Sequence, residues 1–108
     1  MSAEFNETLQ SLHDWLEGFT QRVDAVNIQP TNPEEHQMEI QRLQSLESEL
    51  VQQQPLLSKL KELGKRVGDN TKDHSTKAEL KNKISALEKP ISDMESVLAG
   101  KKSSIEQS

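Results

Sequence analysis

Apolar residues recur along the first quarter of the chain at alternating spacings of four and three positions. These positions are Phe5, Leu9, Leu12, Leu16, Phe19, Val23 and Val26. Residues at such spacings fall on one stripe of an α-helix, which is the seam through which helices pack in a coiled coil. The pattern predicts a helix over about 3–27 that buries its seam against other helices.

Two later stretches show the same spacing. The second seam comprises Leu43, Leu46, Leu50, Gln53, Leu57, Leu60, Gly64 and Val67, with Ile40, Leu56 and Leu63 beside it. The third comprises Leu80, Ile84, Leu87, Ile91, Met94, Leu98, Lys101 and Ile105. These seams predict helices over about 33–68 and 74–106, and we expect weak packing at Gln53, Gly64 and Lys101. No stretch alternates with the period of a strand.

The helix boundaries follow from proline and capping residues. Pro30 and Pro33 cannot continue the first helix. Asn32 is suited to cap the second helix, with Pro33 in its first helical position and Glu35 placed to close a capping box. We expect the third helix to begin between Asp73 and Thr76, with a second capping box over 76–79.

Three helices joined by short loops must run up, down and up. The simplest fold that buries all three seams is an all-α, elongated, left-handed antiparallel three-helix bundle, formed by residues 1–108 as one domain. Helices of about 35 residues give a rod about 50 Å long. Val51, Leu56, Leu63 and Val97 flank the seams and either thicken the core or form an exposed apolar strip.

Two prolines lie inside the predicted helices. Pro55 and Pro90 each remove a hydrogen bond and crowd the preceding turn, so we expect both to kink their helices, at similar heights in the bundle. Either the kinks are local bends accommodated by packing, or they form a softened zone that serves docking or yields under load.

The composition fits a thin bundle. Only 31% of the residues are apolar, which is low for a compact globule but sufficient for a rod that buries only its seams. The net charge of −5 argues against a nucleic-acid-binding module. No apolar run approaches the length of a membrane span, and the N-terminus lacks the features of a signal peptide. We therefore expect a soluble, cytoplasmic protein without direct membrane insertion.

The sequence shows no catalytic or metal-binding pattern. The chain has no cysteine, which excludes disulfides and thiolate chemistry. His13, His36 and His74 lie in three different segments, and adjacent His13 and Asp14 are not expected to face one another. No catalytic motif or phosphate-binding glycine loop occurs. We expect no enzyme activity, no cofactor and no metal site.

Trp15 is the only tryptophan of the chain and lies beside the first seam. In the core, it would bury a large apolar area and its indole nitrogen would need a hydrogen-bond partner. On the surface, it would instead anchor a partner protein. We favour the core position.

Three motifs together resemble a known family. They are Phe5-x3-Leu9-x2-Leu12-x2-Trp15-Leu16, Leu60-x3-Gly64-x2-Val67 and Ile84-x2-Leu87-x3-Ile91-x2-Met94. They are similar to the first, second and third helices of a spectrin repeat over essentially the whole chain. Spectrin repeats usually carry a second tryptophan where Ile91 stands, preceded by a basic residue where Pro90 stands. This departure resembles the divergent repeats of plakin, dystrophin or nesprin-like cytoskeletal linkers.

The resemblance implies a role as a structural spacer. Spectrin repeats stand in tandem, so the chain is expected to be part of a longer array whose neighbouring repeats, cytoskeletal filaments and adaptors are its protein partners. The third seam continues to Ile105 without a terminating glycine or proline, which fits a helix that runs on. Docking surfaces would be the kinks, the glutamines at 52–54 or the lysines of the third helix, Lys72, Lys77, Lys81, Lys83, Lys89, Lys101 and Lys102.

Two alternatives remain open at this stage. One is a chaperone-regulating three-helix module like the BAG domain, and the other is a coiled-coil tether that self-associates. We expect the isolated chain to be a monomer. Its expected location is the cytoskeleton, with the nuclear envelope or cell junctions reached through the longer protein.

Overall fold

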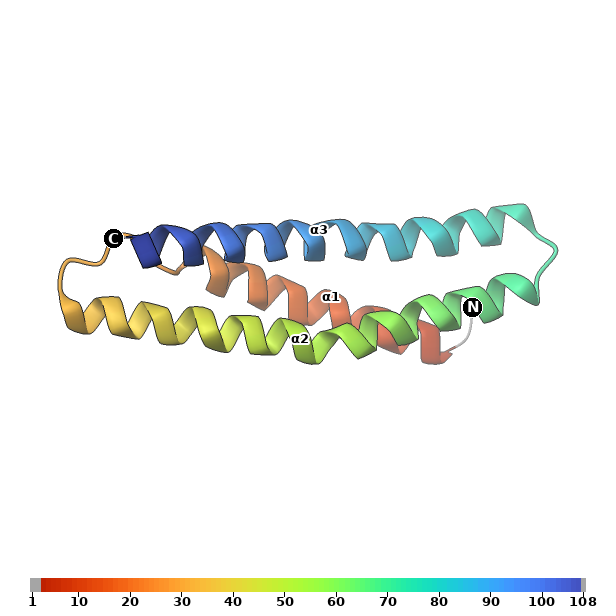
Figure 1. The fold of residues 1–108 in the computed structure, drawn as a ribbon. Helices are drawn as coiled ribbons and strands as arrows, with labels where there is room; N and C mark the ends of the chain where they lie inside the picture. The colour runs from red at the N-terminus through yellow and green to blue at the C-terminus, as the bar shows by residue number, and fades with distance from the viewer. Residues whose placement is uncertain (1–2, 108) are drawn as a thin grey trace.

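Three α-helices account for nearly all of the chain. The structure is a computed structural model that describes residues 3–107, and its helices are α1 (Ala3–Asp24), α2 (Pro33–Asp69) and α3 (His74–Gln107). They pack into a bundle measuring 59 × 18 × 17 Å (Figure 1). Its radius of gyration is 17.3 Å, whereas a compact domain of this length would have about 13 Å. The expected all-α, elongated three-helix bundle is therefore confirmed.

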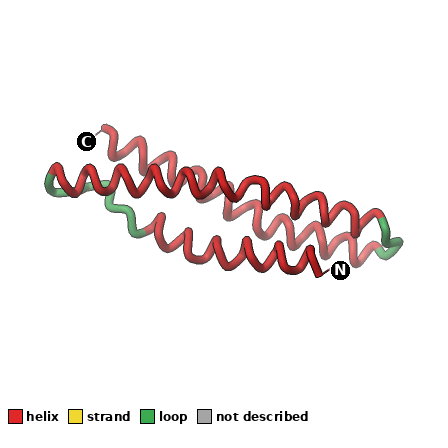
Figure 2. Tube along the Cα trace, turned by 90° about the horizontal axis from the view of Figure 1, so that it is seen from below, coloured by secondary structure: helices red, strands yellow, loops and turns green. Residues whose placement is uncertain are grey.

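The helices run up, down and up. The loop that joins α1 to α2 and the turn that joins α2 to α3 lie at opposite ends of the bundle, so α2 is antiparallel to the other two helices (Figure 2). With 22 residues, α1 is shorter than α2 with 37 and α3 with 34. It therefore packs along only part of the groove between them.

The first helix ends earlier than its seam predicts. The expected end was residue 27, but α1 stops at Asp24 and a tight turn follows, in which the Val26 N–H donates to the carbonyl of Val23 at 3.2 Å. The Asn27 N–H donates to the carboxylate of Glu39 in α2, at 2.9 Å, instead of continuing the helix. Val26 remains buried although it lies outside the helix. A contact with another helix thus decides this boundary.

The start of α2 agrees with its predicted cap, with one difference. Asn32 has an extended backbone and its side chain accepts the N–H of Glu35 at 2.9 Å, while Pro33 takes the first helical position. The Glu35 carboxylate, however, accepts from the backbone and hydroxyl of Thr31, at 3.3 and 3.0 Å. The capping box therefore closes one residue earlier than the standard pattern.

The start of α3 differs from the predicted capping box at 76–79. Asp73 caps this helix, because its carboxylate accepts the N–H of Ser75 at 3.0 Å and the hydroxyl of Thr76 at 2.9 Å. Thr76 thus lies within the first turn, and Glu79 pairs with Lys83 at 3.2 Å. Asp precedes Thr in cap preference, and the carboxylate also suits the positive end of the helix dipole.

Both internal prolines lie in uninterrupted helices. Pro55 is within α2 and Pro90 within α3. Each proline leaves the carbonyl four residues earlier without its helical donor, and these residues, Val51 and Ala86, are exposed, so water can take the place of that donor. Figure 1 shows α2 changing direction midway along its length, with no comparable change visible in α3 from that side. A functional role for paired kinks stays a prediction.

The core follows the long axis from end to end. At the end where α1 begins, Phe5 and Leu60 are fully buried, and at the other end Leu43 and Ile105 are. Gly64 of α2 is buried against the other two helices, and a β-carbon there would lie 2.6 Å from Cδ1 of Ile84 and 3.3 Å from Cε2 of Phe5. The glycine that the sequence presents as a weak position is thus a site of close helix packing.

Candidate functional site

A cluster of Trp15, Phe19, Arg22 and Glu49 joins α1 to α2. The indole N–H of the half-buried Trp15 donates to Oε1 of Glu49 at 2.6 Å. Its ring lies 4.6 Å from that of Phe19 between centroids, with a tilt of 31°. Aromatic pairs in this arrangement pack favourably, and a buried indole requires a hydrogen-bond acceptor. Glu49 is therefore the partner of the tryptophan that the first seam singled out.

Arg22 completes this cluster from the next turn of α1. Its guanidinium donates to both carboxylate oxygens of Glu49, at 2.6 and 2.5 Å, and Nε donates to the carbonyl of Gly18 at 3.3 Å. The Arg22 bond is the main cause that holds the pKa of Glu49 below its usual value, and the indole bond adds to it while burial opposes it. The same bond raises the pKa of Arg22.

Arg22 and Glu49 were not predicted from the sequence. A signal was present, because Trp15, Phe19 and Arg22 are spaced four and three residues apart and share a helix face. That face adjoins the seam, so a carboxylate from a neighbouring helix was the partner to seek. Nothing in the sequence separates Glu49 from the other acidic residues of α2.

Polar side chains close the end of the bundle where α1 stops. Nζ of Lys101, from α3, donates to the carbonyl of Val23 at 2.7 Å and to that of Val26 at 3.1 Å. The C-terminal carbonyls of a helix lack intrahelical donors and carry partial negative charge. Lys101, which the seam pattern marks as a weak position, therefore caps α1 from another helix. Nearby, Nε2 of His36 lies 3.1 Å from the carbonyl oxygen of Ile105.

A surface hollow lies between the second half of α1 and the first half of α2, and we call it the α1/α2 hollow. Its volume is about 480 Å³. It is lined by Arg22, Ala25, Met38, Gln41, Arg42, Ser45, Leu46 and Glu49. Aliphatic side chains and two guanidinium groups thus share one depression. Two residues of the Trp15 cluster, Arg22 and Glu49, are among these lining residues.

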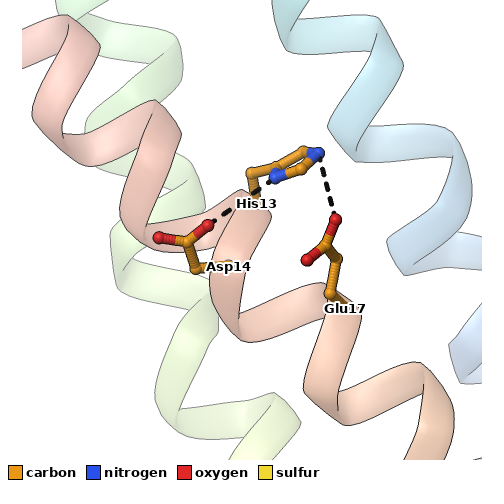
Figure 3. Close-up of side chains that lie close together, drawn as sticks. All are labelled: His13, Asp14 and Glu17. Carbon is orange, nitrogen blue, oxygen red and sulfur yellow. Dashed lines mark ion pairs between the residues drawn. The ribbon is translucent and has the colours of Figure 1, made fainter.

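His13, Asp14 and Glu17 form an exposed cluster on α1 (Figure 3). One ligand atom from each lies within 4.8 Å of the others. Nδ1 of His13 is 3.8 Å from Oδ1 of Asp14, and Nε2 is 4.0 Å from Oε1 of Glu17. The expectation that His13 and Asp14 do not face one another is therefore wrong. All three side chains are exposed on one helix, so water competes with any cation they would hold.

The chain matches the sequence model of a known family. The spectrin repeat matches residues 1–107. The chain belongs to the spectrin-repeat family. Comparisons with curated proteins and with solved structures give no match. The resemblance carried by the three sequence motifs is thus confirmed.

The spectrin repeat is a non-catalytic structural family, typically part of cytoskeletal proteins, and its members generally mediate protein interactions. In the described part of this repeat, 3–107, no helix is long and apolar enough to cross a membrane. The surface features of the repeat are therefore candidate binding sites.

The seam residues of the repeat, with Trp15 beside them, fall into two groups in the structure. Those that are buried are Phe5, Leu12, Leu16, Phe19, Val23, Val26, Leu43, Leu46, Leu50, Leu57, Leu60, Gly64, Leu80, Leu87, Ile91, Leu98 and Ile105. Those that are partly buried are Leu9, Trp15, Val67, Ile84 and Met94, which pack against the core, and Gln53 and Lys101. Thr8 and Glu39 are also buried, although their pattern in the sequence does not predict it. The four flanking residues divide, because Leu56, Leu63 and Val97 join the core while Val51 is exposed.

The suggested docking surfaces of the repeat are only partly available. Lys101 points into the bundle, and Lys83 and Lys102 pair with Glu79 and Glu47 at 3.2 and 3.5 Å. Gln54 donates to Glu95 of α3 at 2.9 Å. The lysine strip is therefore shorter and less basic than the sequence alone indicates.

Proposed function

We propose that this repeat is a spacer of a large cytoskeletal linker protein, which transmits force and offers a docking surface to cytoskeletal filaments or adaptors. The observation that carries the proposal is the position of the helix ends. α1 begins and α3 ends near opposite ends of a bundle 59 Å long (Figures 1 and 2). Tension applied through these helices would therefore act along the long axis.

Contacts between α1 and its neighbours support this mechanical role. Tension along the axis would slide α1 past α2 and α3, so it would load their contacts together instead of one after another. The bidentate pair of Arg22 with Glu49 and the cap that Lys101 places on α1 both oppose such sliding. Burial of the seam adds resistance along the whole of α1.

In a tandem array, α3 would continue into α1 of the next repeat. A shared helix adds an interface between neighbours, and repeat proteins gain stability from such interfaces. The proposed location is the cytoplasm, in association with the cytoskeleton, and the nuclear envelope or cell junctions through the longer protein.

The test joins two copies of the chain without a linker, so that α3 of the first runs directly into α1 of the second. We expect its thermal midpoint to exceed that of the single chain by about 4 °C or more, which corresponds to roughly 1 kcal/mol for a domain of this size. The matched control joins the copies through a flexible Gly/Ser linker of about 20 residues, which breaks the helix and provides no interface. Equal midpoints for the two tandems would contradict the spacer role.

Direct filament contact is tested separately, by co-sedimentation of the single chain with actin filaments and with microtubules. Pelleting with either would support docking to that filament. If neither pellets the chain, docking passes through an adaptor. Sedimentation across a concentration series tests the expected monomer, and a mass that doubles would favour the self-associating tether.

The family match weighs against the BAG-like alternative. The intramolecular closure of all three seams weighs against a tether formed between chains, since Met38 and Val51 are the large apolar residues left exposed among those described.

A further inference from the structure

The basic residues of the acidic half of the chain meet in one place. Residues 1–58 contain ten acidic side chains and two basic ones, Arg22 and Arg42. These two arginines are 20 positions apart in the sequence and lie on different helices, yet both line the α1/α2 hollow. The hollow is therefore where both basic side chains of this half lie, and each is paired there with a carboxylate, Arg22 with Glu49 and Arg42 with Glu39.

Both arginines present their charge more openly than the carboxylates they pair with. The side chains of Arg22 and Arg42 are 50% and 53% exposed, whereas those of Glu49 and Glu39 are 25% and 10% exposed. Three N–H groups of Arg22 are engaged by Glu49 and Gly18, which leaves two of its five. Arg42 contacts Glu39 through Nη1 at 3.2 Å. Donors therefore remain at the rim for a further carboxylate.

Apolar side chains also line the hollow. Met38 is 53% exposed and lines the hollow beside Ala25 and Leu46. A methionine side chain is unbranched and polarizable, so it adapts to varied apolar partners and is common at binding surfaces. Along α2, the lining extends from Met38 to Glu49, which is about 17 Å or three helical turns.

We propose that the α1/α2 hollow binds an acidic amphipathic helix of a partner protein. Its apolar side chains would contact Met38, Ala25 and Leu46, and its flanking carboxylates would accept hydrogen bonds from Arg22 and Arg42. Arginine suits this role because its planar guanidinium can donate two parallel bonds to one carboxylate. At physiological ionic strength, charges are screened beyond about 8 Å, so distant acidic residues oppose this contact little. The nearby carboxylates, Glu49 and Glu39, are less exposed to an incoming helix than the arginines are.

The apolar lining favours this occupant over a nucleic acid or a free phosphate, which would gain nothing from Met38. A basic segment would meet two guanidinium groups, while both oxygens of Glu49 are already engaged by Arg22 and Trp15. The inference deepens the proposed docking role of the repeat. It does not depend on the spacer role, because the tandem experiment measures stability and this one measures binding.

The experiment uses a fluorescein-labelled peptide of about 14 residues, with leucines spaced four and three apart and glutamates beside them, to match three to four helical turns. Fluorescence anisotropy at physiological ionic strength measures its dissociation constant with the full chain. NMR of ¹³C-methyl methionine gives the location. We expect saturable binding in which the Met38 methyl signal shifts and that of Met94, on α3, does not.

Two variants test the contacts, each with a matched control. We expect Met38→Ser and Arg42→Gln each to weaken binding by about fivefold or more, which is the size of a lost apolar or charged contact at a partly exposed site. Val51→Ser removes the other large exposed apolar side chain, and Arg66→Gln removes an exposed arginine that pairs with Glu62 at the far end of α2. Neither control should change the dissociation constant. Arg42→Gln loses its contact with Glu39, so thermal melting checks that this variant remains folded. If it does not, the binding measured for Met38→Ser alone tests the proposed contact.

Several results would overturn the inference. These are the absence of saturable binding, equal binding of a peptide with lysine in place of glutamate, a shift of Met94 instead of Met38, or equal losses in the variants and their controls. A dimer that Met38→Ser abolishes would show that a second copy of the chain occupies the hollow, and this too would overturn it.

Discussion

The two ends of the bundle are closed by different kinds of contact. At the end where α1 begins, Phe5 and Leu60 are fully buried and Gly64 lets the helices approach closely. At the end where α1 stops, charged side chains satisfy the backbone, because Lys101 caps α1 and Glu39 accepts from the loop. The first end depends on the volume of its side chains, whereas the second adds particular donors and acceptors to the buried Leu43 and Ile105.

This difference shows what each kind of closure requires of the sequence. An apolar layer tolerates other side chains of similar volume, so its pattern is visible as a seam. A polar closure depends on individual atoms that face unsatisfied backbone groups, and a lysine in a seam looks like a defect until its partner is known. Lys101 and Gly64 are both exceptions to the seam pattern, yet each has a specific contact.

The largest expected effect is at the apolar end. Phe5→Ala should lower the free energy of unfolding by about 3 kcal/mol, since it removes a buried ring and leaves a cavity. Urea unfolding followed by circular dichroism measures the change. Asn6→Ala, at the exposed neighbouring position, should stay within about 0.5 kcal/mol. A loss of less than about 1 kcal/mol for Phe5→Ala would show that this end contributes little to the bundle.

A smaller loss is expected at the polar end. Lys101→Met keeps the aliphatic stem but removes the donor to Val23 and Val26, which should cost about 1–2 kcal/mol. Lys102→Met breaks an exposed pair with Glu47 and should cost less than about 0.5 kcal/mol. Hydrogen exchange sharpens the test, because the amides of the last turn of α1 should exchange faster only in the Lys101 variant. Equal losses of stability and equal amide exchange rates in the two variants would contradict the capping role of Lys101.

Gly64 tests whether close packing explains its presence. Gly100→Ala, with nothing within 4 Å of the added β-carbon, should stabilise its helix by about 0.5–1 kcal/mol. Gly64→Ala should lose that gain, because its β-carbon would lie 2.6 Å from Cδ1 of Ile84 and 3.3 Å from Cε2 of Phe5. Relative to the wild type, the free energy of unfolding of Gly100→Ala should therefore rise by about 1 kcal/mol more than that of Gly64→Ala. Equal gains would mean that Gly64 is merely tolerated.

The smallest expected effect is the pH dependence of stability that arises from the Trp15 cluster. This cluster combines apolar packing, between Trp15 and Phe19, with the ion pair of Arg22 and Glu49. Because the pKa of Glu49 is lowered on folding, its carboxylate stabilises the folded state above the unfolded value of about 4.5, and this contribution is lost as the pH falls through the folded pKa. Glu49→Gln should therefore reduce stability at pH 7 by less than about 1 kcal/mol, since Arg22 is half exposed.

Urea unfolding at a series of pH values measures the free energy of unfolding of the wild type and of Glu49→Gln. The difference between these two free energies should become smaller below about pH 4.5. Glu47→Gln, which pairs with exposed Lys102, is the control. If the difference in unfolding free energy is the same at pH 7 and at pH 3, the charge of Glu49 does not contribute to stability.

Much of the bundle was predictable because burial follows helical period. The three seams located three helices, and Asn32 with Pro33 located the start of α2. Errors appear at helix ends, where more than one side chain can satisfy a free backbone N–H group. Asn27 pairs with Glu39 instead of extending α1, and Asp73 supersedes Thr76 as the cap of α3.

The candidate binding surface was much less predictable. Met38 carries no special pattern, and Arg22 and Arg42 are far apart in the sequence, so nothing along the chain brings them together. Trp15 was selected, but its partner Glu49 is one of several acidic residues on α2. The relative rotation and height of α1 and α2 decide which of these side chains meet, and these follow from the packing of all three seams at once.

The sequence by itself determined the fold class and the number of helices, because the periodic placement of apolar residues leaves few ways to exclude water. Its three motifs, through their resemblance to the spectrin repeat, also identified the family. Only the tertiary structure decided where α1 ends, what Lys101 and Gly64 do, and that two arginines share a hollow with Met38. The reason is that apolar burial is non-directional and needs only a face, whereas hydrogen bonds, ion pairs and close backbone approach need particular atoms in contact across helices.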